Sequence, residues 1–212
     1  MGLASLPRIL GLATLVGVLV LAAAACGGGT TATLESAGLG QGDVPDAWVA
    51  ADIDDTEGQP LWDTLPDLLT VSSDAHLLLR AFQSDSGLHG AATMFIETDD
   101  AGALPPGYES EQVLEPLTRL LVRQDALLIP DPRGGDPGTY LTPTDKPLPG
   151  SLRSLLVRIV DDRTLYSESL TFVVGHVLAV VTVWYPKGEQ PFADVDDLAS
   201  SVEGRLEALA GS

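Results

Sequence analysis

The stretch TLYSESLTFVVGHVLAVVTVWYP, residues 164–186, decides the fold. Two runs rich in β-branched residues flank Gly175-His176, and a two-residue connection with glycine first is typical of a type II′ hairpin turn. This turn fixes the register, because it makes Val174 face Val177 across the two strands. Side chains alternate along a strand, so every second residue shares one face. We expect the core on the face that carries Leu170, Phe172, Val174, Val177, Ala179 and Val181.

The opposite face of the hairpin is half polar, and a helix follows it. That face carries Ser167, Ser169, Thr171, Val180, Thr182 and Trp184. Beyond the hairpin, apolar residues recur every three or four positions, a pattern typical of a helix with one apolar stripe. Asp194 fits the N-cap of this helix and Gly211 fits its C-terminal stop. The stripe that should cover the sheet is Val195, Leu198, Val202, Leu206 and Leu209.

An earlier region repeats this architecture without repeating the sequence. Residues 75–100 predict a strand pair, and residues 108–126 predict an amphipathic helix. A short strand is expected near residues 48–53. Residues 129–150 are rich in Pro and Gly, so we expect an irregular crossover there or, alternatively, a binding loop. The predicted fold is α+β, an antiparallel sheet of two hairpin-plus-helix units with helices packed on the sheet.

The charge of the chain is strongly negative. It has 11 Lys and Arg against 30 Asp and Glu, which gives a net charge of −19. Nucleic-acid binding needs Lys and Arg to displace counterions from phosphates, so a nucleic-acid partner is excluded. We interpret the acidity as a solvated surface that keeps the protein soluble, rather than as a cation-binding site.

The N-terminal segment predicts export. One positive charge, Arg8, precedes an apolar run over residues 9–25, which is the layout of a signal peptide. The sequence AAAC that ends at Cys26 resembles the lipobox of bacterial lipoproteins, in which the cysteine is diacylated and becomes the new N-terminus. The resemblance implies that a lipid on Cys26 holds the protein on the extracytoplasmic face of the cell membrane. Cleavage at an alanine and an uncleaved helical anchor are the alternatives.

The chain is expected to have three parts. These are a signal peptide over residues 1–25, a lipidated N-terminus with a flexible tether over 26–40, and a single α+β domain over 41–212. The tether is inferred because CGGGTTAT cannot pack a core. Cys26 is the only cysteine in the sequence, so no disulfide can form inside the mature chain.

Common catalytic signatures are absent from the sequence. It contains no P-loop, no Gly-x-Ser-x-Gly, no His-Glu-x-x-His and no cysteine pair. His76 and His89 lie in or beside the first predicted hairpin, and His176 lies in the turn of the second. A Ser-His-Asp arrangement of His76 with residues 72–74 is not favoured, because neighbours in sequence are poor evidence for a triad. We therefore expect neither an enzyme nor a cofactor.

Two further patterns are interpreted as structural. Asp52, Asp54 and Asp63 match positions 1, 3 and 12 of a calcium loop, but its glycine is displaced by one position and Glu is missing from the last. We expect no metal site there. The large aromatic residues could line an apolar pocket, but such side chains are more often core. They are Trp48, Trp62, Trp184, Tyr140, Tyr166 and Tyr185.

Short motifs, which cover the ends of the chain better than its middle, resemble a broad group of small secreted lipoproteins of high-GC bacteria. The motifs are AAAACGGG, GLGQGDVPDAW, GGDPG and ADVDDLASSVEGRL. Several such families are similar to a PsbP-type α/β sandwich, so the resemblance implies an antiparallel sheet with helices packed against it and supplies no catalytic residues. We expect a binding or interaction module whose partner is an envelope protein. The alternative is a carrier that holds a small apolar ligand between sheet and helices.

Overall fold

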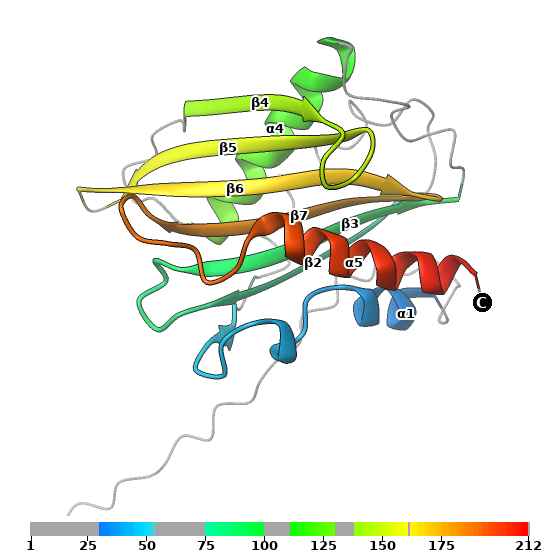
Figure 1. Cartoon of the computed structure of the whole chain (residues 1–212), viewed down its shortest axis with the longest axis horizontal. Coiled ribbons are helices and arrows are strands. Elements are labelled where there is room, and N and C mark those ends of the chain that lie inside the picture. Colours follow the sequence, from blue (N-terminus) through cyan, green and yellow to red (C-terminus); the bar gives the residue numbers. More distant parts are fainter. Residues whose placement is uncertain are drawn as a thin grey trace, which may run out of the picture.

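The computed structural model describes residues 30–51, 53, 75–99, 111–129, 138–160 and 162–211. Its strands form one seven-stranded antiparallel sheet in the order β1-β2-β3-β7-β6-β5-β4. Helices α1 and α5 lie on one face and α4 crosses the other (Figure 1). The fold is α+β, as predicted. The elements are α1 (Thr30–Ala37), the short 3-10 helix η1 (Gln41–Asp43), β1 (Val49–Ala50), β2 (Ala75–Gln83), β3 (Gly90–Thr98), α4 (Glu111–Leu128), β4 (Gly138–Thr144), β5 (Ser151–Val160), β6 (Arg163–Val174), β7 (Val177–Pro186) and α5 (Val195–Ala210).

The hairpin of β6 and β7 has the predicted register. Val174 lies opposite Val177 and Phe172 lies opposite Ala179. Gly175 has φ +59°, a left-handed conformation that glycine adopts at no steric cost. The six residues predicted to share a face all belong to one apolar cluster or pack against it. The predicted register and core face are therefore confirmed.

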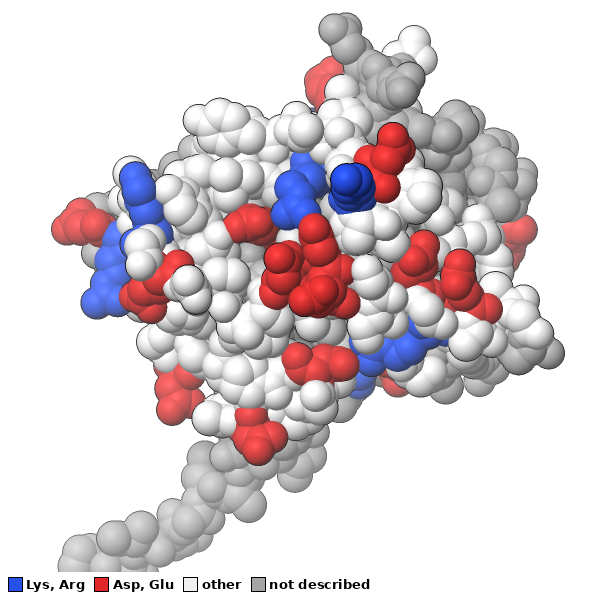
Figure 2. Space-filling model, in the orientation of Figure 1, with Lys and Arg blue, Asp and Glu red and all other residues white. Residues whose placement is uncertain are grey.

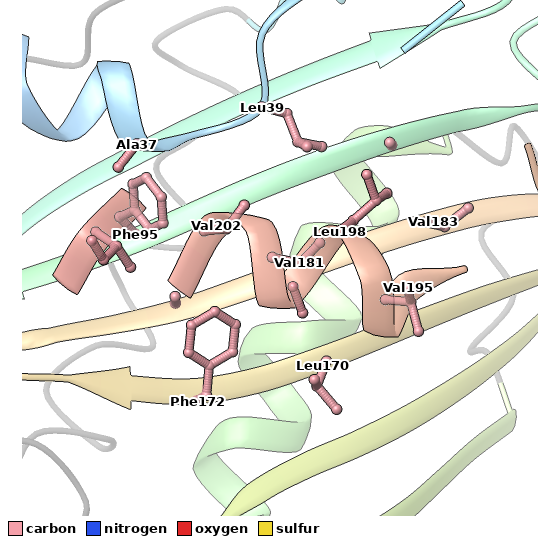
Figure 3. Packing of buried hydrophobic residues seen from close by; sticks show 14 of the residues in the cluster. Ala37, Leu39, Phe95, Leu170, Phe172, Val181, Val183, Val195, Leu198 and Val202 are labelled. Atoms are coloured by element: carbon pink, nitrogen blue, oxygen red, sulfur yellow. The ribbon is translucent and has the colours of Figure 1, made fainter. Parts of the chain in front are cut away.

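Both faces of the central sheet are buried. Beneath α1 and α5, apolar side chains from β2, β3, β6 and β7 form one core (Figure 3). On the other side, α4 covers a second core that includes Trp184. Strand β3 is buried at every position, and β7 at all but one. A strand covered on both faces needs apolar residues at successive positions, which explains the nearly continuous apolar run of β7. The half-polar face of the hairpin is therefore buried as well.

Helix α5 presents the predicted stripe to the sheet. Leu209 is partly buried at the end of the stripe. The carboxylate of Asp194 accepts a hydrogen bond from the backbone N–H of Asp196 at 2.9 Å, so the predicted N-cap is confirmed. Gly211 occupies the C-cap. The buried side chains of α5 are Val195, Leu198, Ala199, Val202 and Leu206.

The sheet extends further than the sequence predicted. The short strand expected near residues 48–53 is β1, but β4 and β5 form an additional antiparallel pair. Strand β4 lies inside the segment expected to be an irregular crossover, so that expectation is wrong for residues 138–144. Pro143 cannot donate a backbone hydrogen bond, and an edge strand tolerates such a residue.

The folded domain begins earlier than the expected boundary at residue 41. Leu34, Ala37 and Leu39 are buried in the core beneath α5. The backbone N–H of Leu39 also donates to the Thr93 hydroxyl at 3.2 Å. The expectation of a flexible tether up to residue 40 is therefore corrected, because α1 contributes apolar side chains to the core.

Phe172→Ala should destabilise the domain by about 3 to 5 kcal/mol, because it leaves a cavity between the sheet and α5. Val173→Ala is the matched control, since the Val173 side chain is 39% exposed on the other side of the same strand. We expect it to cost less than about 1 kcal/mol. Urea denaturation followed by circular dichroism measures both. Equal losses in the two variants would contradict the assigned core face.

Candidate functional site

Several residues singled out in the sequence lie outside the described residues. Cys26 is one of them, and so is Trp62. The aspartates of the calcium-like pattern and residues 72–74 of the disfavoured triad are also outside. They are Asp52, Asp54, Asp63, Ser72, Ser73 and Asp74.

The three histidines lie at two ends of strand β3. His89 precedes β3, and its Nε2 is 3.1 Å from the Glu189 carboxylate. At the other end, Nε2 of His176 is 3.1 Å from Oε1 of Glu97. His76 is the cross-strand neighbour of Glu97 in β2. Among the described residues, no group of three His, Cys, Asp or Glu side chains is placed to hold a metal ion.

The large aromatic side chains that the structure describes do not line a common pocket. Trp48 belongs to the core beneath α5, and its ring meets that of Phe192 edge-on at 4.6 Å. Trp184 belongs to the opposite core, where its ring lies over Gly90. A Cβ atom at Gly90 would lie 1.9 Å from this ring, so the close approach requires glycine. The core interpretation is confirmed for these two tryptophans and is wrong for Tyr140, whose side chain is 66% exposed on the edge strand β4.

Polar side chains are buried between α4 and the sheet. Asp125 and Arg158 form an ion pair with 2.8 Å between Oδ2 and Nε, and their side chains are only 3% and 7% exposed. Gln124 donates to the Thr182 hydroxyl at 3.1 Å, and this hydroxyl lies 2.8 Å from that of Ser169. We call these five residues the α4 polar cluster.

The α4 polar cluster is best explained by packing. Burial raises the pKa of Asp125, while the Arg158 guanidinium and the Ser167 hydroxyl oppose the shift by favouring the charged form. A buried ion pair adds little net stability, but it penalises arrangements in which either charge loses its partner. We interpret the cluster as the feature that fixes how α4 sits on the sheet.

The α4 residues of this cluster were not predicted from the sequence to form a site. Gln124 and Asp125 continue the apolar stripe of α4 at spacings of three and four residues. A polar residue within such a stripe was the available signal that it would be buried. The buried apolar members of the stripe are Leu117, Leu120, Leu121 and Leu128.

One part of the sheet has no described helix over it. Helix α5 contacts β6 and β7, so the outer strands β5 and β4 extend beyond it on the same side (Figure 1). Tyr140 is 66% exposed there and Ile159 is 61% exposed. The space-filling view has a largely uncharged area over these strands, bordered by basic side chains and by an acidic cluster near the start of α5 (Figure 2). We define the open sheet face as Tyr140, Leu155, Val157, Ile159 and Tyr166, which the strand pairing places on one side.

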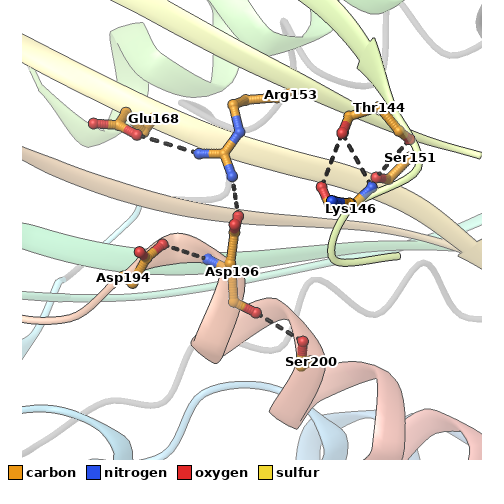
Figure 4. Close-up of polar contacts among 8 residues, drawn as sticks. All are labelled: Thr144, Lys146, Ser151, Arg153, Glu168, Asp194, Asp196 and Ser200. Carbon is orange, nitrogen blue, oxygen red and sulfur yellow. Dashed lines mark hydrogen bonds and ion pairs between the residues drawn. The ribbon is translucent and has the colours of Figure 1, made fainter. Parts of the chain in front are cut away.

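Charged groups mark the border between the open sheet face and α5. Arg153 of β5 donates to Asp196 in the first turn of α5, and its other nitrogen lies 3.5 Å from Glu168 (Figure 4). The Tyr185 hydroxyl donates to the same Glu168 carboxylate. Burial raises the pKa of Tyr185, and the hydrogen bond to Glu168 adds to the shift. These contacts hold the start of α5 beside the open sheet face without covering it.

A recess lies at the other end of α5, beside the β6–β7 turn. Its volume is about 140 Å³. Glu97 and His176 provide its polar groups, and Gly175 also contributes to its wall. Its apolar lining is Leu34, Val174, Val177, Leu206, Leu209 and Ala210.

Arg158→Met should destabilise the protein by about 3 to 5 kcal/mol at neutral pH, because it leaves the Asp125 carboxylate buried without its partner. The folded-state pKa of Asp125 is raised above its unfolded value, so protonation favours the folded variant as the pH falls through that pKa. The loss should therefore be smaller at pH 5 than at pH 7. Adding Asp125→Leu should recover most of the stability, as urea denaturation can measure. A loss that persists in the double variant would contradict the role of the ion pair.

Comparisons with known proteins do not assign this chain to a family, so its function is inferred from its own residues. In the described part of the chain, no helix is both long and apolar enough to cross a membrane. No protein-family model and no curated protein matches this chain.

Proposed function

We propose that the protein is an extracytoplasmic lipoprotein, anchored through a diacylated Cys26, whose folded domain is a protein-interaction module. The anchor is supported by the signal-peptide layout of residues 1–25 and by the small residues before the cysteine. We also propose that the domain is built from two hairpin-plus-helix units and belongs to the PsbP-type sandwiches. A single antiparallel sheet with helices on both faces is compatible with that architecture.

The open sheet face is the observation that carries the interaction function. Most of the sheet is covered on both sides, yet this face leaves a tyrosine and an isoleucine largely exposed. Contiguous exposed apolar surface is uncommon on soluble proteins and marks interaction sites. Tyrosine is also enriched in protein interfaces, since its ring buries a large area and its hydroxyl keeps a polar contact.

The chemistry of the face points to a different protein as its partner. A net charge of −19 makes two copies of the chain repel each other, which disfavours self-association. A partner needs an apolar centre to meet Tyr140 and Ile159, and basic groups at its edge to meet the acidic start of α5. A cationic envelope protein has these properties.

The carrier of an apolar ligand is the second candidate. The recess beside the β6–β7 turn favours it, because it lies between the sheet and the helices as a carrier requires. Its volume of about 140 Å³ is below the roughly 300 to 1,000 Å³ of usual ligand pockets. The recess therefore suits a small molecule better than a lipid.

Cys26→Ser should abolish incorporation of a labelled fatty acid and leave the domain folded. Two acyl chains hold a protein firmly at a membrane, whereas a chain without them is released or remains as a precursor. Feeding cells the labelled fatty acid, followed by membrane fractionation and circular dichroism, tests this expectation. Equal labelling of wild type and variant would rule out the lipid anchor. An unlabelled wild type in the membrane fraction would indicate a helical anchor instead.

A photo-reactive phenylalanine analogue at position 159 should cross-link the full-length protein to one discrete partner in its native membrane. Placing the same probe at position 49 gives a matched control, because Val49 is 53% exposed but lies on β1 at the far edge of the sheet. Tyr140→Asp should abolish the cross-link from position 159, since burying its added charge opposes docking.

Equal cross-linking from positions 49 and 159 would contradict a specific interface. A product of twice the mass of the chain would identify a second copy as the partner and contradict the proposed cationic protein. The same product from the Tyr140→Asp variant would show that the open sheet face is not the docking surface. Mass spectrometry of the cross-linked band distinguishes these results.

A further inference from the structure

The recess at the end of α5 has the size of a site for a small organic molecule. An apolar cavity of about 150 Å³ can hold a benzene molecule. The recess has a volume of about 140 Å³ and an apolar lining contributed by α1, α5 and the β6–β7 turn. A ring or a short branched alkyl group fits this space, whereas a long acyl chain does not.

The polar end of the recess selects the charge of its ligand. The Glu97 side chain is 9% exposed, and among the described residues its carboxylate accepts one side-chain contact, from Nε2 of His176 at 3.1 Å. An ionised carboxylate has about four acceptor positions, so this contact leaves capacity for a donor on a ligand. An ammonium group has donors and no acceptor, and a charge-assisted hydrogen bond is roughly twice as strong as a neutral one.

The charge of the whole chain acts in the same direction. With a net charge of −19, the field around the protein raises the local concentration of cations and lowers that of anions. An organic anion would meet both this field and the Glu97 carboxylate. A neutral molecule of the same shape would gain only from the apolar lining.

We propose that the recess is a binding site for a small organic cation, with an apolar body of about the size of benzene in the recess and an ammonium group at Glu97. The His176 imidazole forms the outer wall, where its half-exposed ring positions the carboxylate. This site is separate from the open sheet face and does not depend on the interaction proposed for that face.

Benzylamine, benzyl alcohol and benzoate are the matched probes, because they share a ring and differ in charge. Titration calorimetry on the full mature protein, purified from its own cells and held in lipid nanodiscs, should give the tightest binding for benzylamine. Glu97→Gln should weaken the binding of benzylamine at least about tenfold and leave the binding of benzyl alcohol nearly unchanged. Gln keeps an acceptor for His176, so the fold should be retained. Glu207→Gln, an exposed acid on α5, is the charge control and should have no effect.

The location of the site is tested by filling the recess. Val174→Trp should abolish benzylamine binding, because Val174 lines the recess. Val173→Trp places the same ring on the opposite side of β6 and should leave binding intact. Melting temperatures show whether the two tryptophan variants fold. If one of them does not fold, Glu97→Gln still tests the proposal.

Four results would overturn the proposal. If benzoate or benzyl alcohol binds as tightly as benzylamine, the recess does not select a cation. If Glu97→Gln binds benzylamine as tightly as the wild type, the Glu97 carboxylate does not contact the ligand. Equal effects of the two tryptophan variants would place the ligand elsewhere. Binding to Cys26→Ser protein but not to the wild type would assign the recess to the protein's own acyl chain.

Discussion

Strand β7 is the element on which the rest of the structure depends, because it is enclosed in all four directions. Its edges pair with β3 and β6, and its two faces lie beneath α4 and α5. Apart from Tyr185, every position of this strand is buried, so its side chains must be apolar or have polar partners. At the edge of the sheet, strand β4 has a much more polar sequence than β7 and no buried residue.

The sequence predicted the centre of the fold better than its edges. The glycine turn and β-branched runs of the hairpin specify a register locally, and the α5 stripe needs only the helical period. Strand β4 could not be recognised in this way, because GTYLTPT contains a glycine, a proline and three threonines and is strand only through its pairing with β5. Helix α1 was missed for a related reason. Its hydrophobic pattern is weak, and Leu34 and Ala37 are buried only because α1 packs beside α5 in the folded domain.

The candidate sites were less predictable, because each is made by residues that are distant in the sequence. Glu97 and His176 come from different hairpins and meet only when β3 pairs with β7. Arg158 looks like an ordinary surface residue within β5, yet it is buried opposite Asp125 of α4. The open sheet face has another cause, since it exists where α5 ends its coverage of the sheet rather than where any motif occurs. The lipidation proposed for Cys26 is of a different kind, because it is inferred from the neighbouring residues in the sequence alone and needs no tertiary contact.

The early start of α1 constrains how the molecule stands at a membrane. Four peptide units separate Cys26 from Thr30, and even a fully extended chain covers only about 14 Å over that distance. If Cys26 carries the proposed lipid, α1 and the recess it lines lie at the membrane-proximal end of the domain. Strand β4 lies four strand positions beyond β3, a distance of about 19 Å at the usual strand spacing, and so forms the distal pole. In the proposed lipoprotein, this short connection would keep the α1 end of the domain close to the headgroups, with strand β4 farther from the membrane.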